Sequence, residues 1–319
     1  MWYPKLIMFN LKKERKRILF VGIPDMAYVC LDACISAGVN IVGVLGPKPS
    51  HNMFNNFKNF VKARGLNFIE CNDFSNPDFI KRIKDLNIDM GVVSSFNYKI
   101  PKVLLESTKD GFINLHPSLL PLYRGANPYS RVILNNETET GVTLHYMDEE
   151  FDTGDIILQV ECPVEPDETM GTLFNKTNEI CVQLLLSALD EYEKRTLPRI
   201  KQRTGDFIKA PNVSPKETSI DYNNTATFIE RQIRALNPFI LANTFFRQEY
   251  IRVMSAKVIN LNIEDDIPNG TIVAVNDDVV IKTGEKCIAF ETMQYGSYFV
   301  GTSKDFIKYI KPKVGERFY

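Results

Sequence analysis

An amide, an imidazole and a carboxylate stand close together in the middle of this sequence. Asn114 and His116 alternate with apolar residues in the run FINLH, and a proline, which cannot continue a central strand, follows directly. Asp152 lies in the turn-rich acidic stretch DEEFDTGD, between predicted strands at 141–147 and 155–160. We therefore expect the three polar side chains where strands end, which is where open α/β sheets collect their active sites.

These residue types suit acyl transfer. If the fold places a carboxylate such as that of Asp152 beside His116, the carboxylate would raise the pKa of the imidazole and fix its tautomer. Asn114 could donate a hydrogen bond to an oxyanion, which is commonly the largest contribution to such reactions. No serine or cysteine nucleophile is needed if the amine of a substrate attacks. The alternatives are structural, because an Asn-x-His pair at a strand end is commonly a polar cap and Asp-Thr-Gly is commonly a turn.

The surrounding motifs carry more information than the three residues alone. The segments NLHPSLLP, YRG, ETGVT and DTGD occur in this order between residues 114 and 155. Together they resemble the formyltransferase family that uses N10-formyltetrahydrofolate, which includes methionyl-tRNA formyltransferase and sugar-nucleotide N-formyltransferases. The resemblance extends from residue 17 to about residue 310. It implies that the chain is a formyltransferase with Asn114, His116 and Asp152 as its catalytic triad.

The same resemblance implies a folate site beside the triad, with N10-formyltetrahydrofolate as cosubstrate. The loop at 94–101 follows a predicted buried strand and offers backbone groups and aromatic faces to a flat pterin, although its aromatic residues could equally cover the core. Carboxylates of the 147–155 loop could accept hydrogen bonds from the pterin edge. With three histidines and no CxxC pair, we expect no metal. The predicted cofactor-binding residues are Phe96, Asn97, Tyr98, Ile100, Met147, Asp148, Glu149 and Asp155.

Buried runs and amphipathic stretches alternate over the first 115 residues. The sequence predicts strands at 17–21, 40–45, 66–71, 88–95 and 112–115, and helices at 26–37, 54–64, 77–86 and 102–107. This order favours an α/β fold with a Rossmann-like, doubly wound parallel sheet. The first turn, GIPD, lacks a Gly-x-Gly-x-x-Gly fingerprint, so we expect no dinucleotide. A long helix is predicted at 169–195.

Composition changes along the chain predict a second domain. Residues 201–219 are polar and contain prolines, as linkers do, so the catalytic domain is predicted at 17–200. Short alternating runs separated by turns fill 220–319 and predict a smaller C-terminal β-barrel-like domain. Residues 1–16 lie outside the resemblance and are predicted to be an N-terminal extension, with an apolar part too short to cross a membrane and no cleavage site.

Composition and charge are those of a soluble enzyme. The chain has 319 residues, of which 44% are hydrophobic, enough for a sizeable core in about two domains. Its formal net charge of -1 gives no global basic field, so tight non-specific nucleic-acid binding is not indicated. Its six cysteines lack CxxC spacing and lie in mostly apolar contexts. They favour a reduced, cytoplasmic protein over a disulfide scaffold or a zinc site.

The acceptor of the formyl group is predicted from one loop and a few polar side chains. Methionyl-tRNA formyltransferases resemble one another in a longer basic loop after the second strand, whereas residues 46–53 here are few and weakly charged. His145 resembles the sugar-modifying branch, and Lys99 and Arg124 could bind a diphosphate. We therefore favour a dTDP- or UDP-linked amino sugar for surface polysaccharide as the substrate. The predicted substrate-binding residues are Lys99, Ser118, Arg124 and His145.

Three other functions stay open. Methionyl-tRNA formylation is the second choice, and the C-terminal cations Lys304, Lys308, Lys311, Lys313 and Arg317 could offer it a modest basic patch, although a solvated face is the ordinary interpretation. A formyltetrahydrofolate hydrolase would share the triad and need no amine. A non-catalytic folate-binding module would have no use for the triad. The sequence leaves the sugar, the nucleotide, the position of the amine and a homodimeric state undecided.

Overall fold

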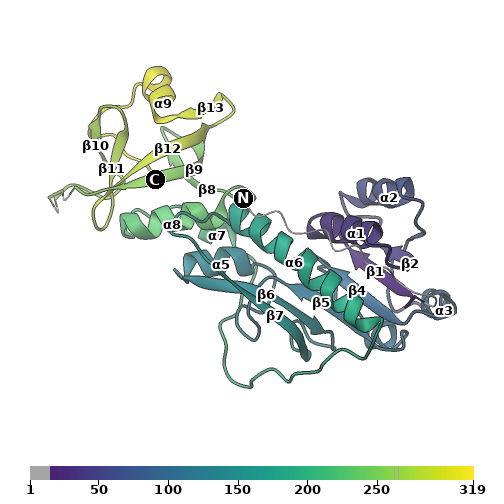
Figure 1. Cartoon of the computed structure of the whole chain (residues 1–319). Helices are drawn as coiled ribbons and strands as arrows, with labels where there is room; N and C mark the ends of the chain where they lie inside the picture. The colour runs from purple at the N-terminus through teal and green to yellow at the C-terminus, as the bar shows by residue number, and fades with distance from the viewer. Residues whose placement is uncertain (1–14, 262, 265) are drawn as a thin grey trace. The chain divides into compact units, whose positions relative to one another are not determined.

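The structure, a computed structural model, describes residues 15–261, 263–264 and 266–319, so the predicted extension at 1–16 lies almost wholly outside the described residues. The chain divides into two compact units (Figure 1). The first unit comprises residues up to 126 together with 140–162 and 176–210. The second unit comprises 127–139, 163–175 and 211–319.

A seven-stranded sheet forms the centre of the first unit, in the order β3-β2-β1-β4-β5-β6-β7. The first five strands along the chain are parallel to their neighbours, and β6 joins β5 in the antiparallel direction. The predicted Rossmann-like sheet is therefore confirmed, with an antiparallel addition at its edge. Its strands are β1 Ile18–Gly22, β2 Ile41–Leu45, β3 Phe68–Ile69, β4 Met90–Ser94, β5 Phe112–His116, β6 Glu139–Tyr146 and β7 Ile156–Pro163.

Helices cover both faces of this sheet (Figure 1). On one face, α1 (Met26–Ser36), α2 (Phe54–Ala63) and α6 (Met170–Tyr192) contribute to a core that contains Ile18 and Phe20 of β1. On the other face, α3 (Pro77–Asp85) and α4 (Lys102–Leu105) pack with Leu19 and Val21 of the same strand. Alternate residues of β1 thus enter two cores, which is why the strand is apolar throughout.

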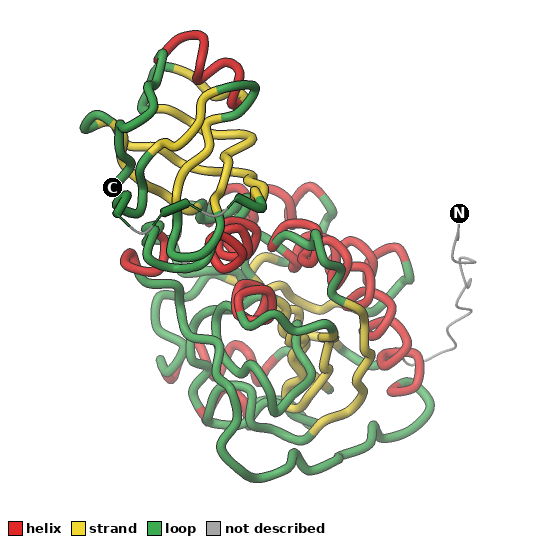
Figure 2. Tube along the Cα trace, turned by 90° about the vertical axis from the view of Figure 1, so that its left-hand side faces the viewer, coloured by secondary structure: helices red, strands yellow, loops and turns green. Residues whose placement is uncertain are grey.

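The second unit contains an antiparallel sheet of six strands, with β10-β11-β12-β9-β8 in order and β13 paired to β12. Residues 317 and 318 bridge Thr271, next to β10, and Phe246 of β8, so the chain end connects the two edges of the sheet. This arrangement agrees with the predicted barrel-like domain. Figure 2 shows both sheets of the chain in yellow. The strands are β8 Ala242–Phe246, β9 Glu249–Ile259, β10 Ile272–Val275, β11 Val279–Lys282, β12 Cys287–Tyr295 and β13 Phe299–Thr302.

The helices of the second unit come from separate parts of the chain. Helix α5 (Pro128–Leu134), which the sequence assigns to the catalytic domain, packs against α8 (Ala226–Leu236). Short helix α7 (Pro215–Thr218) precedes α8, and α9 (Ser303–Ile310) packs on β12. Because α5 packs against α8, residues 127–139 belong to this unit and not to the domain predicted at 17–200.

The long loop between α6 and α7 belongs mainly to the first unit. Ile200 and Ile156 of β7 exchange backbone hydrogen bonds, and Lys209 forms a bridge with Arg124. The predicted linker at 201–219 therefore contains ten residues, 201–210, that are part of the first unit. The polar residues of this stretch therefore belong to a segment that hydrogen-bonds to a folded domain, and not to a free linker.

Candidate active site

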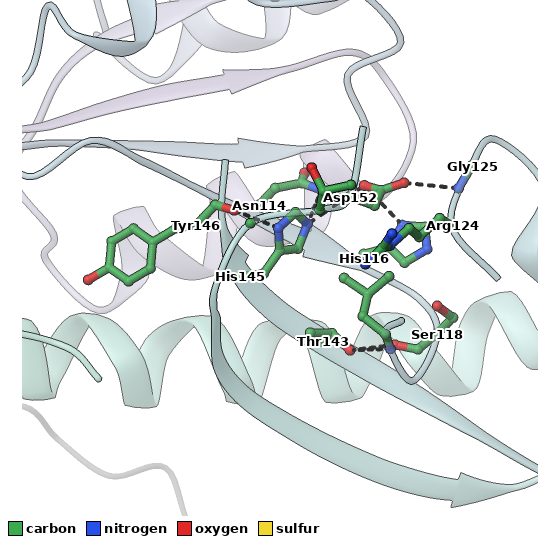
Figure 3. Close-up of polar contacts among 12 residues, drawn as sticks. Asn114, His116, Ser118, Arg124, Gly125, Thr143, His145, Tyr146 and Asp152 are labelled. Atoms are coloured by element: carbon green, nitrogen blue, oxygen red, sulfur yellow. Dashed lines mark hydrogen bonds and ion pairs between the residues drawn. The ribbon is translucent and has the colours of Figure 1, made fainter. Parts of the chain in front are cut away.

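Three polar side chains share one face at the end of β5 and β6. Asn114 and His116 lie two residues apart in β5, so both project from the same face of the sheet. The antiparallel register pairs Asn114 with His145 of β6 and His116 with Thr143. His145 therefore lies directly opposite Asn114 (Figure 3).

Hydrogen bonds fix the orientation of Asn114 and His145. His145 Nδ1 is 2.7 Å from the carbonyl oxygen of Tyr146, a contact that requires a proton on Nδ1. In the neutral ring Nε2 is then an acceptor, and Asn114 Nδ2 lies 3.1 Å from it. The amide of Asn114 donates one hydrogen to His145 and keeps the second for another acceptor.

The carboxylate of Asp152 lies between the two imidazoles (Figure 3). Its Oδ1 is 3.6 Å from His116 Nδ1 and 3.6 Å from His145 Nε2. Its Oδ2 accepts a hydrogen bond of 2.9 Å from the backbone N–H of Gly125. The side chains of His116, His145 and Asp152 are 6%, 2% and 11% exposed, so little solvent screens these contacts.

His116 faces hydrogen-bond acceptors at both ring nitrogens. Its Nε2 is 2.9 Å from the carbonyl oxygen of Tyr123, and its Nδ1 faces Asp152. Burial lowers the pKa of His116 below the ordinary 6.5, and the opposing influence of Asp152 and of the Tyr123 carbonyl does not restore it. The carboxylate thus raises this pKa as the sequence led us to expect, but desolvation outweighs its charge, so the net pKa of the ring is lowered. A lowered pKa favours the neutral ring at pH 7.

Asp152 has the opposite balance. Burial raises the pKa of Asp152, but the charge of protonated His116, the adjacent His145 ring and the hydrogen bond from the Gly125 N–H together lower it to about 2. The site thus combines an anionic carboxylate with a neutral imidazole. Such a pair can take up a proton at the ring and stabilise the imidazolium with the carboxylate.

The residues predicted to bind folate lie around the loop after β4. The rings of Phe96 and Tyr98 are 5.2 Å apart and pack on Phe74 at 5.6 and 5.7 Å, while Asn97 is exposed. Ile100 is buried, and Met147 is partly buried against the same cluster. Both the core-covering role and a ligand-facing role are thus compatible with the half-buried aromatic pair. A pocket of about 370 Å³ lies beside this loop, lined by residues that include Lys48, Phe74, Lys99, Ile100 and Glu149.

The acidic residues of the 147–155 loop make contacts of different kinds. Asp148 accepts hydrogen bonds from Glu150 N at 3.0 Å and Thr153 Oγ1 at 2.5 Å, which stabilises the turn. Glu149 pairs with Lys102 at 3.0 Å on the surface, and Asp155 pairs with Lys201 at 2.9 Å. Asp152 is thus the carboxylate of this loop that pairs with the two imidazoles.

The residues predicted to bind substrate do not form one cluster. Lys99 is exposed and lies 3.5 Å from Glu150, whereas Ser118 is fully buried and donates its hydroxyl hydrogen to Leu122 O at 2.7 Å. Arg124 donates to Gln202 at 2.6 Å. His145 lies beside Asn114 and Asp152, in direct contact with the triad (Figure 3).

Metal and membrane features are not found among the described residues. Over residues 15–261, 263–264 and 266–319, no group of three histidine, cysteine or acidic side chains is arranged to hold a metal ion. All six cysteines are free thiols and buried. No helix in the described part of the chain is long and apolar enough to span a bilayer.

Comparison with known protein families identifies the chain. The model for the formyl transferase domain matches residues 16–189, and the model for the formyl transferase C-terminal domain matches residues 212–309. The chain belongs to the formyl transferase family. The triad and its surroundings are therefore the candidate active site of a formyltransferase, an enzyme that transfers a one-carbon formyl group.

This formyltransferase is similar to other proteins both in sequence and in fold. A methionyl-tRNA formyltransferase of Clostridioides difficile (strain 630) is 35% identical over 87% of this chain and 92% of its own length. One of Thermodesulfovibrio yellowstonii (strain ATCC 51303 / DSM 11347 / YP87) is 31% identical over 91% and 94%. The crystal structure of WlaRD, a sugar 3N-formyl transferase in the presence of dTDP and 5-N-formyl-THF, has a TM-score of 0.66 at 20% identity and covers 90% of this chain and 100% of its own. The last likeness concerns the fold alone.

Sequence reasoning missed three groups that contact the proposed triad: the Tyr123 carbonyl, the Gly125 N–H and the Gln202 side chain. The N–H of Gly125 binds Asp152, and the YRG motif was the available signal for it. Gln202, which lies in the predicted linker, donates to the carbonyl oxygens of Asp152 and Gly154. A glutamine in a polar stretch carried no signal that could have revealed these contacts.

Proposed function

We propose that this formyltransferase transfers the formyl group of N10-formyltetrahydrofolate to the amine of methionyl-tRNA. The observation that carries the proposal is the identity of 31–35% with methionyl-tRNA formyltransferases over about nine-tenths of both chains. This likeness outweighs the preference for an amino sugar that the short 46–53 loop suggested. The six buried thiols suit a reducing compartment, so we place the enzyme in the cytoplasm.

The donor is inferred from the chemistry of the site together with the family. The site supplies an amide donor, a neutral imidazole and a carboxylate, which fit transfer between two amines without a covalent enzyme intermediate. Phe96, Asn97, Tyr98 and Ile100, with Met147, Asp148, Glu149 and Asp155, are the residues proposed to hold the folate. The half-buried aromatic pair and the adjacent pocket of about 370 Å³ support this assignment.

In the proposed mechanism each member of the triad has one role. Asn114 donates its remaining amide hydrogen to the formyl oxygen as negative charge develops there. His116 takes up the proton that the attacking amine loses, directly or through one water, and Asp152 stabilises the imidazolium. The new carbon–nitrogen bond forms on the acceptor, the bond to N10 breaks, and His116 returns the proton to the leaving nitrogen.

A nucleotide-linked amino sugar is the second candidate acceptor. The connection from β2 to α2, residues 46–53, has Lys48 as its single lysine or arginine, and that side chain lies over the rings of Phe74 and Tyr98. A loop that must hold several phosphates needs several cations. A dTDP- or UDP-linked sugar needs only one or two, which Lys99 and Arg124 could supply.

The two acceptors are distinguished by comparing kcat/KM for each of them. Purified full-length protein with N10-formyltetrahydrofolate is assayed against methionyl-tRNA and against a panel of dTDP- and UDP-linked amino sugars. We expect kcat/KM to be larger for methionyl-tRNA than for every sugar. A larger value for a sugar nucleotide would assign the enzyme to the second candidate, and consumption of the donor without any amine would indicate a hydrolase.

A further inference from the structure

We propose that Gln202 is a positioning residue that holds the Asp152 loop in its active conformation. The inference rests on the triad proposed above and extends it to a residue outside the triad. Gln202 lies at the start of the stretch that composition alone marks as a linker. Its side chain reaches back to the loop that carries the carboxylate.

The amide of Gln202 uses both of its donors and its acceptor. Nε2 donates to the carbonyl oxygen of Asp152 at 2.9 Å and to that of Gly154 at 2.8 Å. Oε1 accepts a hydrogen bond of 2.6 Å from Arg124 Nη2. One side chain thus joins the loop at 152–154 to the turn at 123–125.

The loop has a conformation that needs such support. Asp152 has a φ of 58°, in the left-handed region that is unfavourable for a residue with a Cβ. Gly154 is packed so closely that a Cβ there would lie 1.9 Å from the carbonyl oxygen of Tyr146. The two hydrogen bonds from Gln202 hold the carbonyl groups on either side of Thr153, and so fix the direction in which the Asp152 side chain points.

The segment that carries Gln202 also holds the turn at 123–125 by its backbone. Tyr123 N donates to Ile208 O at 2.7 Å, and Ala210 N donates to Arg124 O at 2.8 Å. That turn supplies the carbonyl oxygen that faces His116 Nε2 and the Gly125 N–H that binds Asp152. Residues 200–210 therefore position both partners of the His116–Asp152 pair, and Gln202 contributes the side-chain link between them.

Loss of this link has a specific consequence. The carboxylate is 3.6 Å from both imidazoles, and a displacement of about 1 Å can lower a rate by roughly 10²-fold. The chemical step depends on this distance, whereas two of the three side-chain hydrogen bonds of Gln202 go to backbone carbonyl groups and one goes to Arg124, a residue proposed to bind the acceptor. We therefore expect kcat to fall more than KM rises.

The test compares two variants of Gln202 with a matched glutamine elsewhere. Gln202→Met keeps the length and removes every hydrogen bond, while Gln202→Glu can still accept from Arg124 but cannot donate to the two carbonyl groups near neutral pH. Gln232→Met is the control, because Gln232 Nε2 also donates to two carbonyl oxygens, Glu217 O at 2.8 Å and Ser219 O at 3.1 Å, within the second unit. Full-length proteins are assayed with N10-formyltetrahydrofolate and whichever acceptor the wild-type enzyme uses.

We expect both Gln202 variants to lower kcat by about 10- to 100-fold, and we expect Gln202→Met to move the acidic limb of the pH–rate profile to lower pH, as a displaced carboxylate supports the imidazolium less well. Gln232→Met should lower the unfolding midpoint without either effect. The proposal is overturned if Gln202→Glu keeps the wild-type kcat, if the kcat of Gln202→Met stays within twofold of the control, or if the acidic limb of Gln202→Met does not move. Failure of the triad itself would be recognised separately, because Asp152→Asn would then also be active.

Discussion

The carboxylate of Asp152 lies 3.6 Å from two imidazoles, and all three side chains are largely buried. Geometry favours a proton on His116, since Tyr123 O and Asp152 Oδ1 face its two ring nitrogens. Burial opposes that proton and lowers the pKa of the ring. A base that is neutral at rest but has acceptors in place for its protonated form is suited to taking up a proton transiently.

Replacing Asp152 by asparagine tests this balance. The change keeps the shape of the side chain but removes the negative charge that opposes the lowering of the His116 pKa. The pKa of His116 should fall further, so the acidic limb of the pH–rate profile, where the base becomes protonated, should move to lower pH. The rate at the plateau should fall at the same time. The measurement is kcat as a function of pH.

The surface carboxylate Glu150 provides the control for that variant. It is exposed and lies 3.5 Å from Lys99, so Glu150→Gln should leave the acidic limb in place. If the Glu150 variant moves the limb and the Asp152 variant does not, the proposed triad contains the wrong carboxylate.

At this scale the sequence predicted the residue types but not all of their partners. Asn114, His116 and Asp152 could be found because they stand at strand ends within a run of motifs. The pairing of Asn114 with His145 depends on the register between β5 and β6, which no local pattern encodes. The balance of the His116 pKa depends on burial, which also appears only in the folded chain.

Among the elements, the turn at 123–125 is held between the triad and residues 208–210. Gly125 has a φ of +123°, and a Cβ at this position would lie 2.6 Å from the carbonyl oxygen of Ala210. Its N–H is the donor to Asp152 Oδ2. This glycine is therefore required both by its backbone conformation and by the close approach of another chain segment.

Gly125→Ala should lower stability and activity together. The strained conformation costs about 1 kcal/mol and the overlap with Ala210 about 1–3 kcal/mol, while movement of the turn withdraws the N–H from Asp152. Chemical denaturation and kcat are the two measurements. Gly65→Ala is the control, because Gly65 also has a positive φ, of 73°, but nothing within 4 Å of a Cβ, so only the conformational cost should appear. Equal effects of the two substitutions on kcat would contradict the account of the turn.

The regular elements of the first unit were predictable, and its connections were less so. Apolar runs and amphipathic spacing gave β1, β2, β4 and β5, because each of these signals is local. The strand predicted at 66–71 is reduced to β3, Phe68–Ile69, and the helix predicted at 102–107 ends at Leu105. The polar composition of residues 201–210 predicts a linker, whereas their hydrogen bonds reach partners distant in sequence, which no local pattern encodes.

For the whole molecule, domain boundaries followed tertiary packing more than composition. The sequence predicts one boundary within 201–219, whereas the second unit also includes 127–139 and 163–175. Helix α5 lies in the first of these segments and packs on α8, a contact between distant parts of the chain. The two family models match residues 16–189 and 212–309. These bounds do not show that 127–139 and 163–175 belong to the second unit.

The dependence of activity on salt should identify the class of acceptor. A tRNA is held by contacts to several phosphates, so log(kcat/KM) should fall with log[salt] at a slope steeper than about −2, with roughly −0.7 to −0.9 for each phosphate contacted. A sugar nucleotide carries one diphosphate and should give a shallower slope. Measurements between about 50 and 200 mM potassium chloride, at one pH and one donor concentration, distinguish the two classes of acceptor. A shallow slope with methionyl-tRNA would contradict recognition through its backbone.

The most direct test of the central claim is the single-turnover rate of formyl transfer from N10-formyltetrahydrofolate to methionyl-tRNA, measured for the wild-type protein and for Asn114→Ala and His116→Ala. We predict transfer by the wild-type protein and a rate at least about 10²-fold lower in each variant, with tRNA affinity and the unfolding midpoint almost unchanged. A variant that retains a near wild-type rate would remove its residue from the mechanism. No transfer by the wild-type protein would contradict the proposed acceptor.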